Sequence, residues 1–90
     1  MLRKNKEPLA IIFGDNISDK RKHKGMTYVH LAEQLGIGPD FLARIERGIT
    51  APKLQILEKM VQVLECSVAE LFLYDKNEVS YKYAPGHHKT

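Results

Sequence analysis

The sequence has a single cysteine, no apolar run long enough to cross a membrane, and no leader-like amino terminus. Cys66 cannot form an internal disulfide, so we expect it to be a reduced core residue in a cytoplasmic protein. The longest uninterrupted apolar run, residues 9–13, falls far below the ~20 residues of a membrane-spanning helix. The first residues lack the long apolar core and the small-residue cleavage site of a signal peptide, so we expect none.

Patterns typical of catalytic and metal-binding sites are also missing. His23, His30, His87 and His88 do not have the spacing of zinc ligands. The pair His87 and His88 could capture a metal adventitiously, but a flexible tail is the stronger interpretation. No glycine-rich phosphate loop follows a strand, and no nucleophile with a partner base can be identified. We therefore expect no enzymatic activity, no metal and no cofactor.

What the chain does have is one domain's worth of residues and an uneven distribution of charge. Its 90 residues allow a single domain with a modest core. Residues 20–53 hold seven lysines and arginines against three acidic residues, a net charge of +4. Residues 1–19 are neutral, and residues 54–90 carry −1. Basic charge gathered on one element is typical of a phosphate-binding surface, although a run of charge is often only a solvated face.

The segment TYVHLAEQLGIGPDFLARIERG, residues 27–48, predicts two short amphipathic helices joined by a tight turn. Thr27 is a suitable N-cap for the first helix, and Gly36 ends that helix. Pro39 begins the second helix because its fixed φ and missing N–H suit the first helical position, and Gly48 ends it. The inward faces are expected to hold Leu31, Ala32, Leu35, Leu42 and Ile45. Two helices joined in this way form the helix-turn-helix that places side chains in the major groove of DNA.

Three further helices are expected around this pair. One covers residues 8–24, a second covers residues 53–65, and a short last helix opens at a capping box formed by Ser67 and Glu70. The inward residues of the two long helices are expected to be Leu9, Ile12, Phe13 and Ile17, then Leu54, Leu57, Val61 and Leu64. Residues 75–90 are polar and are expected to form an extended or mobile tail.

In their order along the chain, these residues resemble the Cro/C1-type helix-turn-helix domain of bacterial and phage transcriptional regulators. The matching residues are Phe13-Gly14, Ile17, Arg21, Gly25-Met26-Thr27, Leu31-Ala32, Gly36-Ile37-Gly38, residues 42–48, Pro52, Leu57, Leu64, Ser67 and Glu70-Leu71-Phe72. The resemblance implies an all-α, five-helix, lambda-repressor-like domain over residues 9–74, with the helix-turn-helix at residues 28–47. A basic arm, residues 1–8, would precede the domain, and residues 75–90 would follow it as a tail that could join a dimer interface.

The resemblance also implies which residues contact double-stranded DNA. They are Thr27, Tyr28, Pro39, Asp40, Phe41, Ala43, Arg44, Arg47 and Lys53. Asp40, Ala43 and Arg44 are the expected readers of base edges. Arg44 is the candidate for a bidentate contact with guanine, and Asp40 could accept a hydrogen bond from a cytosine amino group.

The other expected contacts have competing interpretations. Tyr28 stands where the family usually has glutamine, and its hydroxyl could donate to a phosphate or the ring could simply pack on the surface. Phe41 could touch a thymine methyl group or pack between the two helices. Arg47 is expected to neutralise a phosphate. Lys53 replaces the family's serine or threonine cap, and since a lysine cannot cap a helix amino terminus, a phosphate contact explains it better.

Two further sets of residues follow from the resemblance. Arg21 and Glu46 should form a partly buried ion pair that orients the second helix of the motif. A homodimer should form through Leu71, Phe72, Leu73 and Tyr74, because a short helix cannot turn all four inward. Residues 79–83 alternate apolar and polar side chains, so they could pair as a strand across the dimer axis, or they could belong to a disordered tail.

The function that these expectations favour is a sequence-specific transcriptional regulator that binds a palindromic operator as a homodimer. An autoregulatory repressor and the controller of a restriction–modification operon both suit a chain of this length. An antitoxin, which binds a partner protein such as a toxin, or another protein-interaction module, is the alternative. The +4 charge of residues 20–53 argues against a module that binds only protein.

Overall fold

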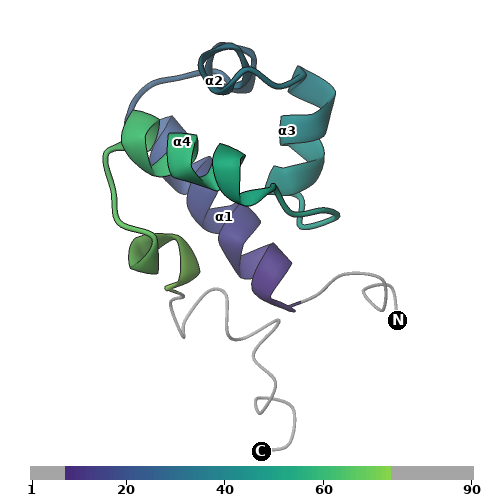
Figure 1. Cartoon of the computed structure of the whole chain (residues 1–90), viewed down its shortest axis with the longest axis vertical. Helices are drawn as coiled ribbons and strands as arrows, with labels where there is room; N and C mark the ends of the chain where they lie inside the picture. Colours follow the sequence, from purple (N-terminus) through teal and green to yellow (C-terminus); the bar gives the residue numbers. More distant parts are fainter. Residues whose placement is uncertain (1–7, 74–90) are drawn as a thin grey trace, which may run out of the picture.

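The computed structural model describes residues 8–73, which form four α-helices and one turn of 3-10 helix (Figure 1). The elements are α1 (Pro8–His23), α2 (Tyr28–Leu35), α3 (Pro39–Glu46), α4 (Leu54–Leu64) and η1 (Ala69–Phe72). The all-α class expected from the sequence is thus present across this part of the chain. None of the helices in residues 8–73 combines the length and the apolar composition that a membrane span requires. The strand considered for residues 79–83 lies outside the described residues.

Local capping signals set the ends of α2 and α3 where the sequence predicts them. The Thr27 hydroxyl accepts a hydrogen bond from the His30 backbone N–H at 3.0 Å, and Gly36 ends α2 in the left-handed conformation. Helix α3 begins with Pro39 directly after Gly38. Gly48 follows α3 with a φ of 77°, a conformation that glycine adopts without strain.

The last expected helix is a single turn of 3-10 helix. Its capping box forms, since the Ser67 backbone N–H donates to the Glu70 carboxylate at 2.8 Å and the Glu70 N–H donates to the Ser67 hydroxyl at 3.2 Å. Only the four residues of η1 follow the box, and they adopt the tighter 3-10 geometry. The expected count of five helices is therefore not confirmed.

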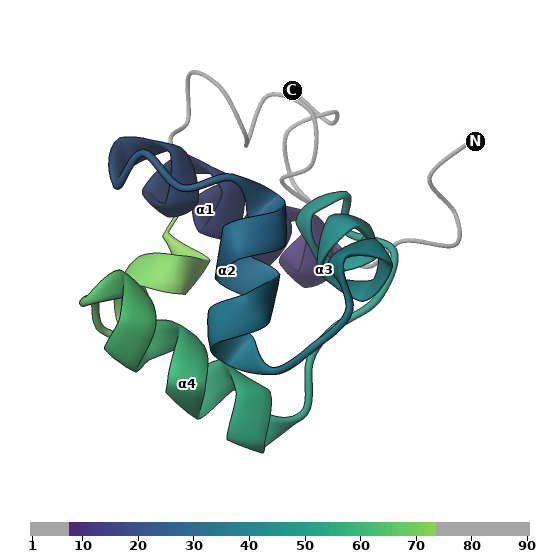
Figure 2. The same ribbon diagram turned by 90° about the horizontal axis from the view of Figure 1, so that it is seen from above.

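The core lies where the four helices meet, and α1 packs on α3 and η1 while α2 packs on α3 and α4 (Figure 2). Its fully buried side chains come from every element and include Ile17, Leu31, Leu35, Leu42, Ile45, Met60 and Leu71. Cys66 packs against this core but is only partly buried, and that burial raises the pKa of its thiol.

Two residues expected to face inward do not. Leu9 is 61% exposed and Leu54 is 78% exposed. Each belongs to the first turn of its helix, where the apolar stripe extends past the elements that cover the rest of it. Met60, which the sequence analysis did not select, is fully buried on α4 instead.

Glycines let α1 and the end of α3 approach at backbone distance. A Cβ atom on Gly14 would lie 2.7 Å from the Glu46 carbonyl oxygen and closer still to that of Ile45. A Cβ atom on Gly48 would lie 2.8 Å from the Cα of Ile11. Because these neighbours are backbone atoms, a side chain could be accommodated only by moving α3 away from α1.

Candidate nucleic-acid interface

Helix α3 turns one face into the core and leaves a charged face outside. Leu42 and Ile45 are fully buried, whereas Asp40, Arg44 and Arg47 are exposed. Pro39 is exposed as well, and Ala43 is half-buried at the border. Asp40 lies in the first turn of α3 and Arg44 in its last, so each charge also complements the helix dipole. We call the exposed side chains of Asp40, Arg44 and Arg47 the outer face of α3.

Phe41 packs between the outer face of α3 and the hydrophobic core. Its ring is partly buried and packs against the hydrophobic core, which agrees with the interpretation that it fills space between helices. The guanidinium carbon of Arg44 lies 5.8 Å from the centroid of the same ring. A cation held over an aromatic face in this way is attracted to the ring, so the head group of Arg44 has a preferred position.

The ion pair of Arg21 and Glu46 joins α1 to the end of α3. The Arg21 Nε donates to Glu46 Oε2 at 2.7 Å and its Nη2 donates to Oε1 at 2.9 Å, a bidentate arrangement. A third guanidinium nitrogen, Nη1, donates to the Met26 carbonyl at 2.9 Å. Both side chains are only 11% exposed. The hydrogen bond with Glu46 raises the pKa of Arg21 despite the opposing effect of burial, so the guanidinium remains charged.

The amino terminus of α2 lies beside this ion pair. The guanidinium carbon of Arg21 lies 5.8 Å from the centroid of the Tyr28 ring, so the ring covers the pair from outside. Tyr28 itself is exposed, as is its neighbour Thr27, which caps the helix. The first-turn N–H groups of α2 that Thr27 does not satisfy have no acceptor within the helix, and such groups attract anions.

Lys53 lies outside the helix-turn-helix, immediately before α4. It occupies the N-cap position and is exposed, and its side chain makes no capping hydrogen bond. The absence of a capping role leaves its ammonium group available to solvent.

The residues expected at a dimer interface differ in their exposure, and one of them is not described. Leu71 is fully buried in the core, so its side chain cannot contact a second copy, and we remove it from that interface. Phe72 is 38% exposed and Leu73 is 63% exposed, which leaves both accessible. Tyr74 lies outside the described residues.

The structural roles of Asn16 and Gly14 were not predicted from the sequence. The Asn16 side-chain amide donates to the carbonyl oxygens of Leu71 and Leu73, and so ties the end of η1 to α1. No local pattern signals a contact between residues so far apart in the chain. Gly14 did carry a signal, because a glycine in the middle of a helix is unfavourable unless another backbone must come close.

The chain is similar to known helix-turn-helix proteins. A sequence profile of the family described as Helix-turn-helix matches residues 17–71. The chain is 41% identical over 71 residues to the HTH-type transcriptional regulator SinR of Bacillus subtilis (strain 168), an alignment that covers 78% of this chain and 63% of SinR. The chain therefore spans less than two thirds of the length of this curated relative.

Two solved structures share the fold. The restriction-modification controller protein C.AhdI from Aeromonas hydrophila has a TM-score of 0.65 and 27% identity, and the match covers 70% of this chain and 96% of that chain. The master regulator for biofilm formation SinR, in complex with DNA, has a TM-score of 0.61 and 42% identity, and the match covers 66% of this chain and 95% of that chain.

Proposed function

The chain belongs to the Cro/C1-type helix-turn-helix family, and from this premise we propose that it is a sequence-specific, DNA-binding transcriptional regulator. The observation that carries the proposal is the outer face of α3, whose two arginines are exposed on a helix held by the Arg21–Glu46 pair. The similarity to SinR, which has been solved in complex with DNA, supports it.

In this proposal the outer face of α3 enters the major groove. Arg44 reads guanine through two parallel hydrogen bonds, and Asp40 accepts from a cytosine amino group. Ala43, at the border of the face, contacts a base edge without a polar group. The preferred position of Arg44 over Phe41 reduces the conformational entropy that the arginine loses on binding.

The remaining contacts position the protein on the phosphate backbone rather than read sequence. Arg47 at the end of α3 and Lys53 before α4 neutralise phosphates on either side of the groove. Thr27 and Tyr28 place the amino terminus of α2 against another phosphate, where the N–H groups of the first turn favour negative charge. Arg21 is already committed to Glu46 and Met26, so it acts by orienting α3.

The protein binds a palindromic operator as a homodimer, because one short recognition helix reads only a few base pairs. The dimer interface is built around Leu73, which is more exposed than Phe72. The dimer places two copies of α3 about 34 Å apart, one helical turn of DNA. Similarity to the restriction-modification controller C.AhdI, which the chain covers almost completely, favours an autoregulatory repressor or a controller of this kind.

Selection of bound duplexes from a random DNA pool tests the proposal. We expect an inverted repeat to emerge, with half-sites one helical turn apart. The doubly substituted chain Arg44→Ala/Arg47→Ala is the matched control and should enrich no motif, while remaining folded because both residues are exposed. If the wild-type chain enriched no motif and yet retained a protein partner, it would be a protein-interaction module instead.

A further inference from the structure

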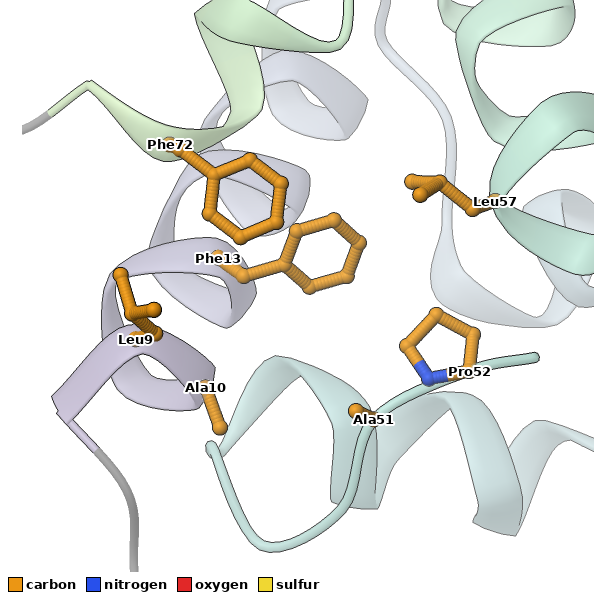
Figure 3. A pocket seen from close by; sticks show the side chains of 7 residues that line it. All are labelled: Leu9, Ala10, Phe13, Ala51, Pro52, Leu57 and Phe72. Atoms are coloured by element: carbon orange, nitrogen blue, oxygen red, sulfur yellow. The ribbon is translucent and has the colours of Figure 1, made fainter. Parts of the chain in front are cut away.

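An apolar groove opens on the side of the molecule formed by the first turns of α1, the α3–α4 loop, α4 and η1. It is lined by Leu9, Ala10, Phe13, Ala51, Pro52, Leu57 and Phe72, and its volume is about 300 Å³. Figure 3 shows Phe13 and Phe72 facing Leu57 and Pro52 across the opening, with the two alanines below. No charged side chain of residues 8–73 lines it, so it favours an apolar occupant.

The chain leaves the described domain at the edge of this groove. The rings of Phe13 and Phe72 pack with their centroids 5.2 Å apart, which fixes Phe72 on the groove wall. Asn16 donates to the carbonyls of Leu71 and Leu73 at 3.0 and 2.5 Å, which fixes the main chain on both sides of Phe72. The last described residues are therefore held by α1 itself.

The 17 residues that follow Leu73 contain a suitable apolar segment. Val79, Tyr81 and Tyr83 alternate with Ser80 and Lys82, so an extended chain would present three apolar side chains on one side. A spacer of five residues, 74–78, separates this segment from Leu73. Five residues reach at most about 18 Å when extended, a span comparable with the length of three helical turns.

We propose that residues 79–83 dock in the apolar groove of their own chain. A connection of only five residues gives the segment an effective concentration in the millimolar range, whereas a second copy is present at micromolar concentration. The intramolecular occupant therefore has an advantage of about a thousandfold over the same segment of another molecule. The proposal requires neither DNA nor a dimer, and Leu73, which does not line the groove, stays available to a second copy.

Thermal unfolding of the full chain gives the first test. The triple variant Val79→Ser/Tyr81→Ser/Tyr83→Ser should lower Tm by several degrees, because it removes apolar area from the groove. Lys82→Ser, on the opposite side of the segment, is the matched control and should leave Tm unchanged. The effect of the triple variant should shrink in a Leu9→Ala background, since Leu9 supplies part of the wall. Equal Tm values for the triple variant and the control would overturn the proposal.

Nuclear Overhauser contacts identify the occupant directly. Uniformly ¹³C-labelled chain should show contacts between the tail tyrosine rings and the Leu57 methyl groups. A mixture of labelled and unlabelled chains, recorded with isotope filtering, should show none of them, because filtering retains only contacts between molecules. Contacts in the filtered spectrum would assign the groove to a second copy and contradict the proposal. The absence of contacts in both spectra would contradict it as well.

Discussion

The two halves of α1 differ in how completely the rest of the domain covers their side chains. In the carboxy-terminal half, Ile17 is fully buried and Arg21 is bound by Glu46 and Met26, so every inward group has a partner. In the amino-terminal half, Leu9 is 61% exposed, and it lines an open groove together with Phe13. The domain covers the inward side chains of the carboxy-terminal half, whereas the first turn of the amino-terminal half presents an apolar side chain, Leu9, that the described residues leave uncovered.

This difference predicts different effects for substitutions in the two halves of α1 and on the outer face of α3. The closed half holds α3 at a fixed angle, so its residues should affect stability and DNA binding together. Side chains on the outer face of α3 should affect DNA binding alone. Exposed side chains at the open half, such as Leu9, should change the stability of the described domain less than the paired side chains of the closed half.

The largest expected effect comes from breaking the ion pair in the closed half. Arg21→Ala or Glu46→Ala leaves a nearly buried charge without its partner, which costs ~3–5 kcal/mol when burial is complete. We expect a loss near the lower end of that range, because 11% of each side chain is exposed. Denaturant unfolding of both single variants and the double variant measures the coupling.

The pair of Lys24 and Glu65 provides the control for that cycle. These side chains also form an ion pair, at 2.9 Å, but they lie in solvent. Their coupling should be about 0–1 kcal/mol. Additive effects at Arg21 and Glu46 would show that the two residues do not act as a unit.

Gly14→Ala should have the next largest effect. The added methyl group meets the carbonyls of Ile45 and Glu46, and backbone atoms cannot rotate away as a side chain can. We expect a loss of about 1–3 kcal/mol in the free energy of unfolding and weaker DNA binding, because α3 must shift. Gly38→Ala is the control, since no atom lies within 4 Å of the added group. Equal losses for the two variants would show that close packing of α1 on α3 is unimportant.

Arg44→Ala should change DNA binding without changing stability. Losing a bidentate contact with guanine costs ~1–3 kcal/mol and relaxes the preference at one base pair of each half-site. Arg47→Ala, Lys53→Ala and Tyr28→Phe should weaken binding to all sequences alike and reduce its salt dependence. Competition binding with single-base variants of the selected duplex distinguishes the two patterns. An unchanged motif after Arg44→Ala would mean that another residue reads the base.

The smallest effect on stability should come from Leu73, which follows η1. Leu73→Ser replaces an exposed side chain, so the free energy of unfolding should change by no more than about 0.5 kcal/mol. The same variant should weaken the homodimer, which sedimentation equilibrium measures. Lys22→Ser, an exposed position on α1, serves as the control. Identical dimerisation of the two variants would exclude Leu73 from the interface.

Local chemistry explains why the helix bounds could be predicted. Thr27, Gly36, Pro39 and Gly48 each act on their own turn of the chain, so their effect can be read without tertiary information. The capping box of Ser67 and Glu70 was predicted for the same reason.

The wrong or missing predictions concern residues whose burial or contacts depend on tertiary packing. Periodicity identifies an apolar stripe but does not show where the covering elements end, so Leu9 and Leu54 were wrongly placed in the core. The number of apolar residues after Glu70 indicated that some must be exposed, but only the packing of η1 shows that Leu71 is inside. The hydrogen bonds of Asn16 join residues more than 50 positions apart and leave no trace in the local sequence.

The salt dependence of DNA binding tests the central claim most directly. Affinity for the selected palindromic duplex should be measured at several salt concentrations, with the wild-type chain and with Arg44→Ala/Arg47→Ala. Each phosphate neutralised by a lysine or arginine releases counterions, so log K should fall steeply and linearly with log salt concentration. The slope should be shallower for the double variant. A flat dependence in the wild-type chain would contradict the assignment of α3 and its flanking cations to DNA.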